Sequence, residues 1–131
     1  MLERRRGQVV VMASIAGLLA TKNMGFYNTT KFALVGMART LMIELHGTGV
    51  RCALICPGVA STGFQQRADN KKLARITRLV ACTAEQVAEA TVRAIRRRTH
   101  GEVIVPWYSR VLTILGGPIP GLTRFVIRLI G

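Results

Sequence analysis

A tyrosine and a lysine stand four residues apart in the segment FYNTTKFALVG, residues 26–36. Apolar residues recur through this segment at helical spacing, and residues four apart on a helix share one face. Lys31 is therefore expected beside Tyr27, where its ammonium group would favour the ionised form of the phenol. A tyrosine in that setting can act as a general acid or base at neutral pH. Because the same spacing also occurs by chance in many helices, the surroundings of the pair decide whether it is catalytic.

A serine, a Pro-Gly pair and a threonine follow predicted strands. Ser14 ends one strand, and Pro57-Gly58 ends the next, with Thr62 just beyond. In open parallel sheets, ligands bind at the edge where the strands end. We therefore expect these residues to gather at one site with the tyrosine and the lysine.

Strands and helices alternate in the predicted structure. Apolar runs rich in β-branched residues are typical of strands buried in a parallel sheet, and apolar residues at three- and four-residue spacing are typical of helices. Strands are expected at residues 8–13, 50–56 and 102–106, long helices at 26–46 and 83–98, and a short helix near 68–80. This order predicts a parallel α/β sheet with crossover helices, its strands side by side in chain order.

The two long helices carry end signals. Gly47 and Gly49 take the place of glycines beyond a helix C-terminus, and Thr83 with Gln86 forms a capping-box pattern. The faces expected against the sheet are Leu34, Met37, Ala38, Leu41, Met42 and Leu45 in the first helix, and Val87, Ala88, Thr91, Ala94 and Ile95 in the second.

The chain of 131 residues is long enough for one domain, and its charge is lopsided. It has 19 Lys and Arg against 6 Asp and Glu, a net charge of +13. Such a balance suits a phosphate-bearing cofactor, and it also raises nucleic acid or an anionic membrane as a partner. No zinc-finger spacing, RNP-type aromatic motif or heptad zipper is present, so no specific nucleic-acid partner is expected. A non-enzymatic basic binding module for nucleic acid or an anionic membrane remains an alternative function.

Three cysteines, Cys52, Cys56 and Cys82, form an odd set without metal-ligand spacing. We expect no metal site and no disulfide framework, and we expect the cysteines to be small buried apolar residues. A reducing cytoplasm is the expected location.

Both ends of the chain are apolar. The first twenty residues resemble a secretory signal in composition, but they include a good buried strand. In the tail, residues 107–131, two prolines together with Arg124 and Arg128 argue against a membrane span. The tail is expected to form an amphipathic helix that packs on its own domain, covers a substrate pocket or makes a peripheral membrane contact.

Four segments in order resemble the short-chain dehydrogenases/reductases. GQVVVMASIAG is similar to the strand that carries the family's serine, and YNTTK to its Tyr-x-x-x-Lys motif. ICPGVASTGF is similar to the Pro-Gly segment after the next strand, and TAEQVAEATVRAIRRRTHGEVIVP to the last helix and strand of the sheet. The resemblance extends to about residue 106. It implies a single, partial Rossmann-like doubly wound domain over residues 1–131, consisting of the last three strands, their crossover helices and an apolar helical tail.

The resemblance also implies roles for the candidate residues. Tyr27 would be the acid/base at the oxygen of a carbonyl or secondary alcohol, Lys31 would bind the ribose of NAD or NADP, and Ser14 would hold the substrate oxygen. The segment Pro57, Gly58 and Val59 would cradle the nicotinamide, and Thr62 would contact its amide. The expected reaction is hydride transfer between this cofactor and a small carbonyl or alcohol substrate, which the apolar tail suggests is lipophilic. A homo-oligomer is expected for the full-length protein.

One part of the family pattern is missing. This sequence has no glycine-rich turn after a leading strand, no Asn-Ala-Gly segment and no asparagine that would complete the proton relay. The chain is therefore expected to be the C-terminal half of a dehydrogenase, with its first strand exposing an unpaired edge. A catalytically inactive fragment, or one that only pairs with a partner chain, is a further alternative. The acidic or basic residue that would distinguish NAD from NADP at the ribose would lie in the missing half. The sequence therefore does not show which of the two cofactors is used.

Overall fold

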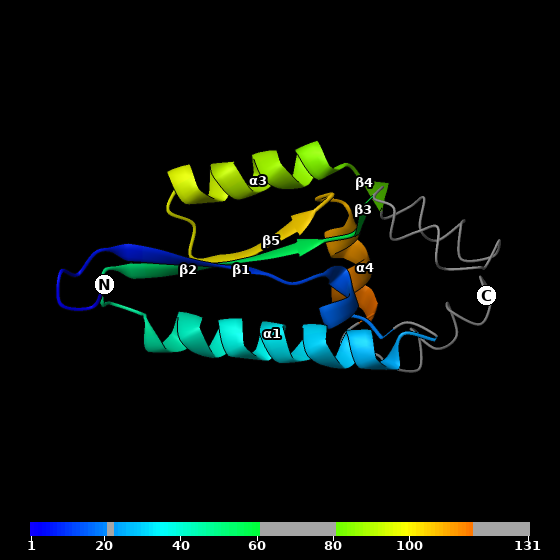
Figure 1. Ribbon diagram of the computed structural model, residues 1–131, viewed down its shortest axis with the longest axis horizontal. Coiled ribbons are helices and arrows are strands. Elements are labelled where there is room, and N and C mark those ends of the chain that lie inside the picture. Colours follow the sequence, from blue (N-terminus) through cyan, green and yellow to red (C-terminus); the bar gives the residue numbers. More distant parts are fainter. Residues whose placement is uncertain (21–22, 61–80, 117–131) are drawn as a thin grey trace.

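The computed structural model describes residues 1–20, 23–60 and 81–116, which form an α/β fold (Figure 1). The predicted short helix near 68–80, Thr62 and most of the apolar tail lie outside the described residues. The elements are β1 (Gly7–Met12), the 3-10 turn η1 (Ile15–Gly17), α1 (Gly25–Glu44), β2 (Val50–Pro57), β3 (Val59–Ala60), β4 (Ala81–Cys82), α3 (Ala84–Arg96), β5 (Gly101–Val105) and α4 (Ser109–Gly116).

The main sheet has three parallel strands in the order β1-β2-β5, as predicted. Its register pairs Val9 with Cys52 and Ile55 with Val103. Helix α1 covers one face of the sheet and α3 covers the other (Figure 1), so the domain has three layers. A second, two-stranded parallel sheet joins β3 to β4 beyond the end of β2.

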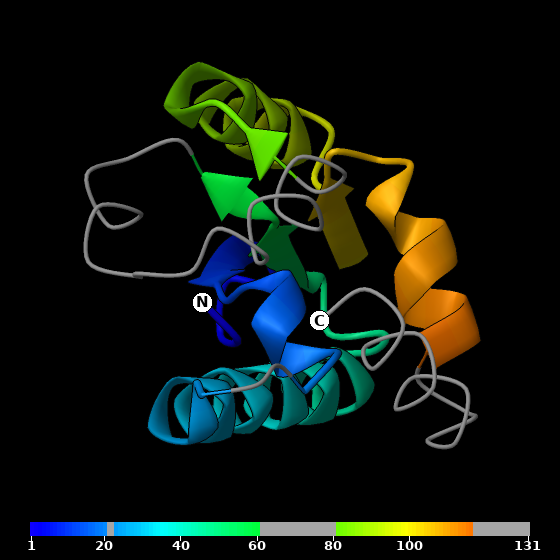
Figure 2. The same cartoon turned by 90° about the vertical axis from the view of Figure 1, so that its right-hand side faces the viewer.

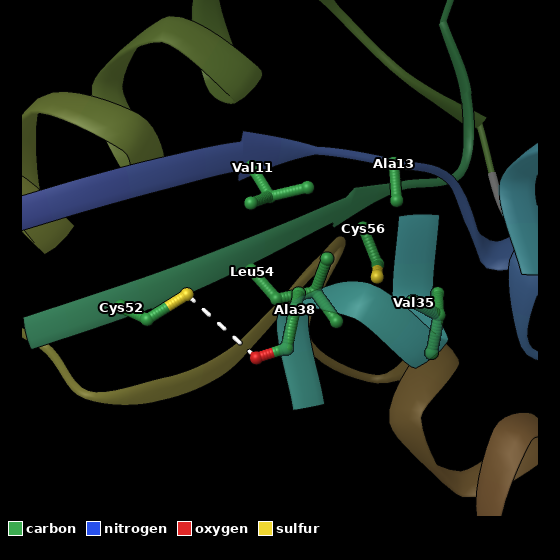
Figure 3. Packing of buried hydrophobic residues seen from close by; sticks show 7 residues of the cluster. All are labelled: Val11, Ala13, Val35, Ala38, Cys52, Leu54 and Cys56. Atoms are coloured by element: carbon green, nitrogen blue, oxygen red, sulfur yellow. Dashed lines mark hydrogen bonds between the residues drawn. The ribbon is translucent and has the colours of Figure 1, made fainter. Parts of the chain in front are cut away.

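Strand β2 forms the centre of the core because both of its faces are covered. Cys52, Leu54 and Cys56 point into a cluster under α1, where they meet Val35 and Ala38 of the helix (Figure 3). The intervening Ala53 and Ile55 pack with Ala94 of α3 on the opposite face. Full burial of a side chain such as Leu54 stabilises the fold by about 1.5–3 kcal/mol.

All three cysteines are buried and free, which confirms the prediction that they are core residues rather than disulfide partners. No group of three or more metal-binding side chains is found in the described part of the chain. No helix within residues 1–20, 23–60 or 81–116 is long and apolar enough to cross a membrane.

Strand β1 is less buried than the sequence predicted. Within the described residues it pairs only with β2, so it is an edge strand, and Val11 is its one buried residue. Met12, at its end, is 43% exposed. The expectation of an open first edge is therefore consistent with the described structure. Both faces of β1 are covered only in part: Val9 and Val11 pack in the cluster under α1, and Val10 packs against the cluster on the opposite face.

The helices end where their signals predicted, but their buried faces are narrower than predicted. Gly47 has a φ of 74°, and Thr83 forms the capping box with Gln86. Three predicted core residues are exposed: Met37 is 48% exposed, Ile95 is 47% exposed, and Ala88 is also exposed. Adjacent helical residues are about 100° apart. Met37 and Ile95, each next to a buried alanine, therefore point away from the sheet.

Candidate functional site

The predicted site residues meet at the end of the molecule toward which the strands run. Figure 2 faces this end, where η1, the β3-β4 pair and the beginnings of α1 and α4 surround the last residues of the sheet. The main strands are parallel, so the turn after β1 and the turn after β2 lie next to each other here. The expectation of a site at the carboxyl edge therefore agrees with the topology.

Ser14 joins the ends of the two neighbouring strands. Its hydroxyl donates to the carbonyl oxygen of Pro57 at 3.3 Å and accepts from the backbone N–H of Ala16 at 3.1 Å. Its backbone is extended and caps η1, so the chain turns immediately after β1. Ser14 is only 7% exposed, which means that the protein fixes the place of its hydroxyl.

Tyr27 and Lys31 occupy the first two turns of α1, one helical turn apart. The Lys31 Nζ lies 5.5 Å from the centroid of the Tyr27 ring, within the range of a cation–π contact. Both side chains are half-buried. The predicted proximity of Tyr27 and Lys31 is therefore confirmed.

Gly17 brings the serine turn against the helix that carries the tyrosine and the lysine. A Cβ at Gly17 would lie 2.5 Å from the carbonyl oxygen of Lys31 and 2.8 Å from a methyl group of Val35. Only glycine fits at this contact without movement of backbone atoms. Gly17 was not among the predicted site residues, although the small residues between the strand and the helix were the available signal.

Cys56 lies directly behind the serine. Its thiol is buried and lies beside the backbone of Ser14. Burial raises the pKa of the Cys56 thiol to about 12, and the nearby Glu102 carboxylate acts in the same direction. The thiol is therefore neutral at physiological pH, and Cys56 supports the Ser14 turn rather than acting as a nucleophile.

The segment after β2 is held on both sides. The backbone N–H of Gly58 donates to the carbonyl oxygen of Val105 at the end of β5, at 2.6 Å. Val59 then pairs with Ala81 in the small sheet. Pro57, Gly58 and Val59 therefore form a fixed ledge beside Ser14. Thr62, the remaining predicted residue of the site, lies outside the described residues.

A model of the short-chain dehydrogenase family matches residues 1–73, which is more than half of the chain. The chain is similar to the ketoacyl reductase HetN of Nostoc sp., with 38% identity over 108 residues that cover 80% of this chain and 36% of the relative. It is also similar to 2-(R)-hydroxypropyl-CoM dehydrogenase of Xanthobacter autotrophicus, with 35% identity over 98 residues that cover 70% of this chain and 39% of the relative.

The chain is also similar to a solved structure of this family. A short-chain dehydrogenase/reductase from Burkholderia phymatum, in complex with NAD, superposes with a TM-score of 0.70 and 28% identity. The match covers 93% of this chain and 51% of that one. The chain thus spans about half of that structure and less than half of the curated relatives named above. With the family model, these similarities show that the chain belongs to the short-chain dehydrogenase/reductase family, whose members are NAD(P)-dependent oxidoreductases.

Proposed function

We propose that this chain supplies the acid/base half of a reaction that reduces a carbonyl group, or oxidises a secondary alcohol, with NAD or NADP. The observation that carries the proposal is the meeting of three elements at the carboxyl edge. The Ser14 hydroxyl, the Tyr27–Lys31 pair and the Pro57–Gly58 ledge come from different parts of the chain. The hydrogen bond from Ser14 to the Pro57 carbonyl oxygen and the close approach of Gly17 to the Lys31 backbone bring them together. Each has the chemistry that such a reaction requires.

Tyr27 is the proton donor and acceptor in this proposal. In the reducing direction, its hydroxyl gives a proton to the carbonyl oxygen of the substrate as that oxygen becomes negative. The Lys31 ammonium, 5.5 Å from the ring centroid, stabilises the negative charge left on the tyrosine. In the oxidising direction the same phenolate removes the proton of the alcohol. General acid–base help of this kind contributes roughly 10²–10⁴-fold in rate.

Ser14 is the second group on the substrate oxygen. Its present bond to the Pro57 carbonyl oxygen is 3.3 Å, longer than the usual range of about 2.5–3.0 Å for O–H···O bonds. A weak bond of this kind is readily exchanged for a shorter bond to a substrate. The Ala16 N–H keeps the hydroxyl oxygen in place during that exchange. Ser14 would therefore orient the substrate and stabilise charge that develops on its oxygen.

The residues present fit the nicotinamide end of the cofactor. Lys31 offers a cation with several donors next to Tyr27, suited to ribose hydroxyls. The ledge of Pro57, Gly58 and Val59 is fixed at the sheet edge where dinucleotides bind in open α/β folds. When bound, the cofactor supplies or accepts the hydride. The described residues contain no glycine-rich turn for the pyrophosphate.

We also propose a lipophilic substrate. Helix α4 begins just beyond β5, beside the carboxyl edge (Figure 2), and exposes Val111 and Ile114. The preceding Trp107 is 80% exposed. Apolar side chains at the rim of a site favour a substrate with a hydrocarbon part.

The proposal is tested in a polypeptide that carries these 131 residues behind a nucleotide-binding half with a Gly-x-x-x-Gly-x-Gly turn. We expect ketones with apolar chains to cause oxidation of NADH or NADPH, measured by the loss of absorbance of the reduced nicotinamide. Failure with every ketone, and with secondary alcohols in the reverse direction, would count against the proposal.

The 131-residue chain alone is expected to be a poor enzyme or none. The reason is that binding of the pyrophosphate normally requires backbone N–H groups of a glycine-rich turn at a helix N-terminus. A fluorescence titration of the chain with NADH and NADPH should show no saturation. Micromolar affinity would contradict this expectation.

A further inference from the structure

The end of the molecule opposite the candidate site gathers arginines. At this end, called here the amino edge, the three main strands begin and helices α1 and α3 finish (Figure 1). The amino edge consists of residues 1–6, 43–51 and 96–101. These three segments contain seven arginines and two acidic residues, Glu3 and Glu44. The arginines are Arg4, Arg5, Arg6, Arg51, Arg96, Arg97 and Arg98.

Hydrogen bonds hold the three segments together. Arg5 Nη2 donates to the carbonyl oxygen of Gly47, and Arg98 Nη2 donates to that of Gly49, each at 3.1 Å. Gly49 also lies against the backbone of Arg5, because a Cβ at this position would clash with the Arg5 carbonyl oxygen. The first, middle and last segments of the amino edge therefore meet at one turn, and their charges form a single surface.

The positive charge of this surface is not neutralised by ion pairs. In the described part of the chain, the one ion pair joins Arg39 to Glu102 at 2.7 Å, and neither residue belongs to the amino edge. All seven arginines are exposed. The C-terminal ends of α1 and α3 each carry about half a negative charge, which offsets only a small part of the total. A surface with this excess attracts phosphate groups, and the guanidinium group binds them in bidentate geometry.

The neighbouring side chains distinguish a membrane from a nucleic acid. Met1, Leu2 and Ile43 stand among the arginines and are 55%, 59% and 77% exposed. Aliphatic side chains next to basic ones suit the headgroup layer of a bilayer. The aromatic residues on which unpaired bases would stack are elsewhere in the described structure, on the first half of α1 or directly after β5.

We propose that the amino edge docks on the surface of a bilayer that contains anionic phospholipid. The arginines contact headgroup phosphates, and the aliphatic side chains enter the headgroup layer. Because the strands run from this edge to the candidate site, the docked domain presents Ser14 and Tyr27 away from the bilayer. The proposal does not depend on the proposed reaction.

The test is flotation of the 131-residue chain with two kinds of vesicle, phosphatidylcholine alone and phosphatidylcholine mixed with phosphatidylglycerol. We expect binding only to the mixed vesicles, and we expect it to weaken as salt is added. Each arginine near an anionic surface contributes about fivefold in affinity. Arg51→Gln and Arg97→Gln should each lose about that factor, and the triple variant with Arg6→Gln about 100-fold.

Arg110→Gln on α4 is the matched control, since it removes the same charge from an exposed position outside the amino edge. It should bind the mixed vesicles like the parent chain. Far-UV circular dichroism checks that the variants keep their helices. If the triple variant loses helix content, the vesicle binding of the single variants tests the proposal.

Three results would overturn the proposal. Equal binding to vesicles of phosphatidylcholine alone would assign membrane contact to apolar residues such as those of the tail. An equal loss in Arg110→Gln would show that overall charge, not the amino edge, drives binding. Tighter binding to RNA or duplex DNA than to the mixed vesicles, lost in the same arginine variants, would make nucleic acid the partner of this surface.

Discussion

Gly17 lies directly against the backbone of Lys31, so close that a Cβ on the glycine would come within 2.5 Å of the lysine carbonyl oxygen. The contact joins the turn that begins with Ser14 to the helix that carries Tyr27. The relative position of the serine and the tyrosine–lysine pair is thus fixed by two backbones rather than by flexible side chains. A site for acid/base chemistry benefits from such rigid support.

Replacing Gly17 with alanine is expected to push η1 away from α1. The added methyl group meets backbone atoms of Lys31, which cannot move without distorting the helix. We expect Gly17→Ala to lower the free energy of unfolding by about 1–3 kcal/mol, measured by urea denaturation.

Gly36→Ala is the matched control for this prediction. Gly36 is also on α1, but a Cβ there meets nothing within 4 Å. Alanine should therefore stabilise the helix by about 0.5–1 kcal/mol. Equal stability of Gly17→Ala and the parent chain would show that the contact between η1 and α1 is not as tight as described.

His100 is expected to be a structural residue. Its Nδ1 accepts from the backbone N–H of Cys52 at 3.1 Å, and its Nε2 lies 3.0 Å from the carbonyl oxygen of Met42. Both bonds form together when Nε2 carries the proton. His100→Phe leaves a backbone donor and a backbone acceptor without this partner and should cost about 1–3 kcal/mol in unfolding free energy.

The exposed His46, at the end of α1, provides the comparison for His100. His46→Ala should change the unfolding free energy by no more than about 0.5 kcal/mol. If the two histidine variants have the same urea midpoint, the bridging role of His100 is refuted.

Cys56 is expected to make stability fall at alkaline pH. Its folded-state pKa, about 12, lies above the ordinary thiol value of 9.0, so the folded protein holds the thiol proton more tightly than the unfolded chain. The resulting stabilisation is complete below pH 9 and declines as the pH rises from 9 toward 12. At pH 10 the loss from this group is about 1.4 kcal/mol.

The measurement compares urea denaturation at pH 8 and pH 10 for the parent chain and Cys56→Ala. Other groups that titrate in this range contribute to both proteins and cancel in the comparison. The variant should lose about 1.4 kcal/mol less than the parent between the two pH values. The same decline in both proteins would mean that the thiol is not shielded as the structure indicates.

Much of the fold could be predicted because the signals are local. The apolar run of β2, the capping box of Thr83 with Gln86 and the glycines after α1 each act within a few residues of chain. Alternation of strands and helices then leaves few arrangements for a parallel sheet. The proximity of Tyr27 and Lys31 was predictable for the same reason, since one helical turn separates them.

The remaining features depend on contacts between distant segments. Gly17 meets Lys31, and Cys56 meets Ser14, only after the chain has folded, so neither role can be seen in residue spacing. The exposure of Met37 likewise depends on where the helix touches the sheet. A pattern of apolar residues indicates a face but not its width.

The central claim is that Tyr27 transfers the proton, and its direct test is Tyr27→Phe in a polypeptide that also carries the nucleotide-binding half. Phenylalanine keeps the ring beside Lys31 and removes only the hydroxyl. We expect the turnover of a ketone to fall by roughly 10²–10⁴-fold while the Kd for NADH or NADPH is unchanged. Tyr108→Phe, which alters the other, half-exposed tyrosine, should leave turnover intact. If Tyr27→Phe retains turnover within about tenfold of the parent, the proposed acid/base role of Tyr27 is contradicted.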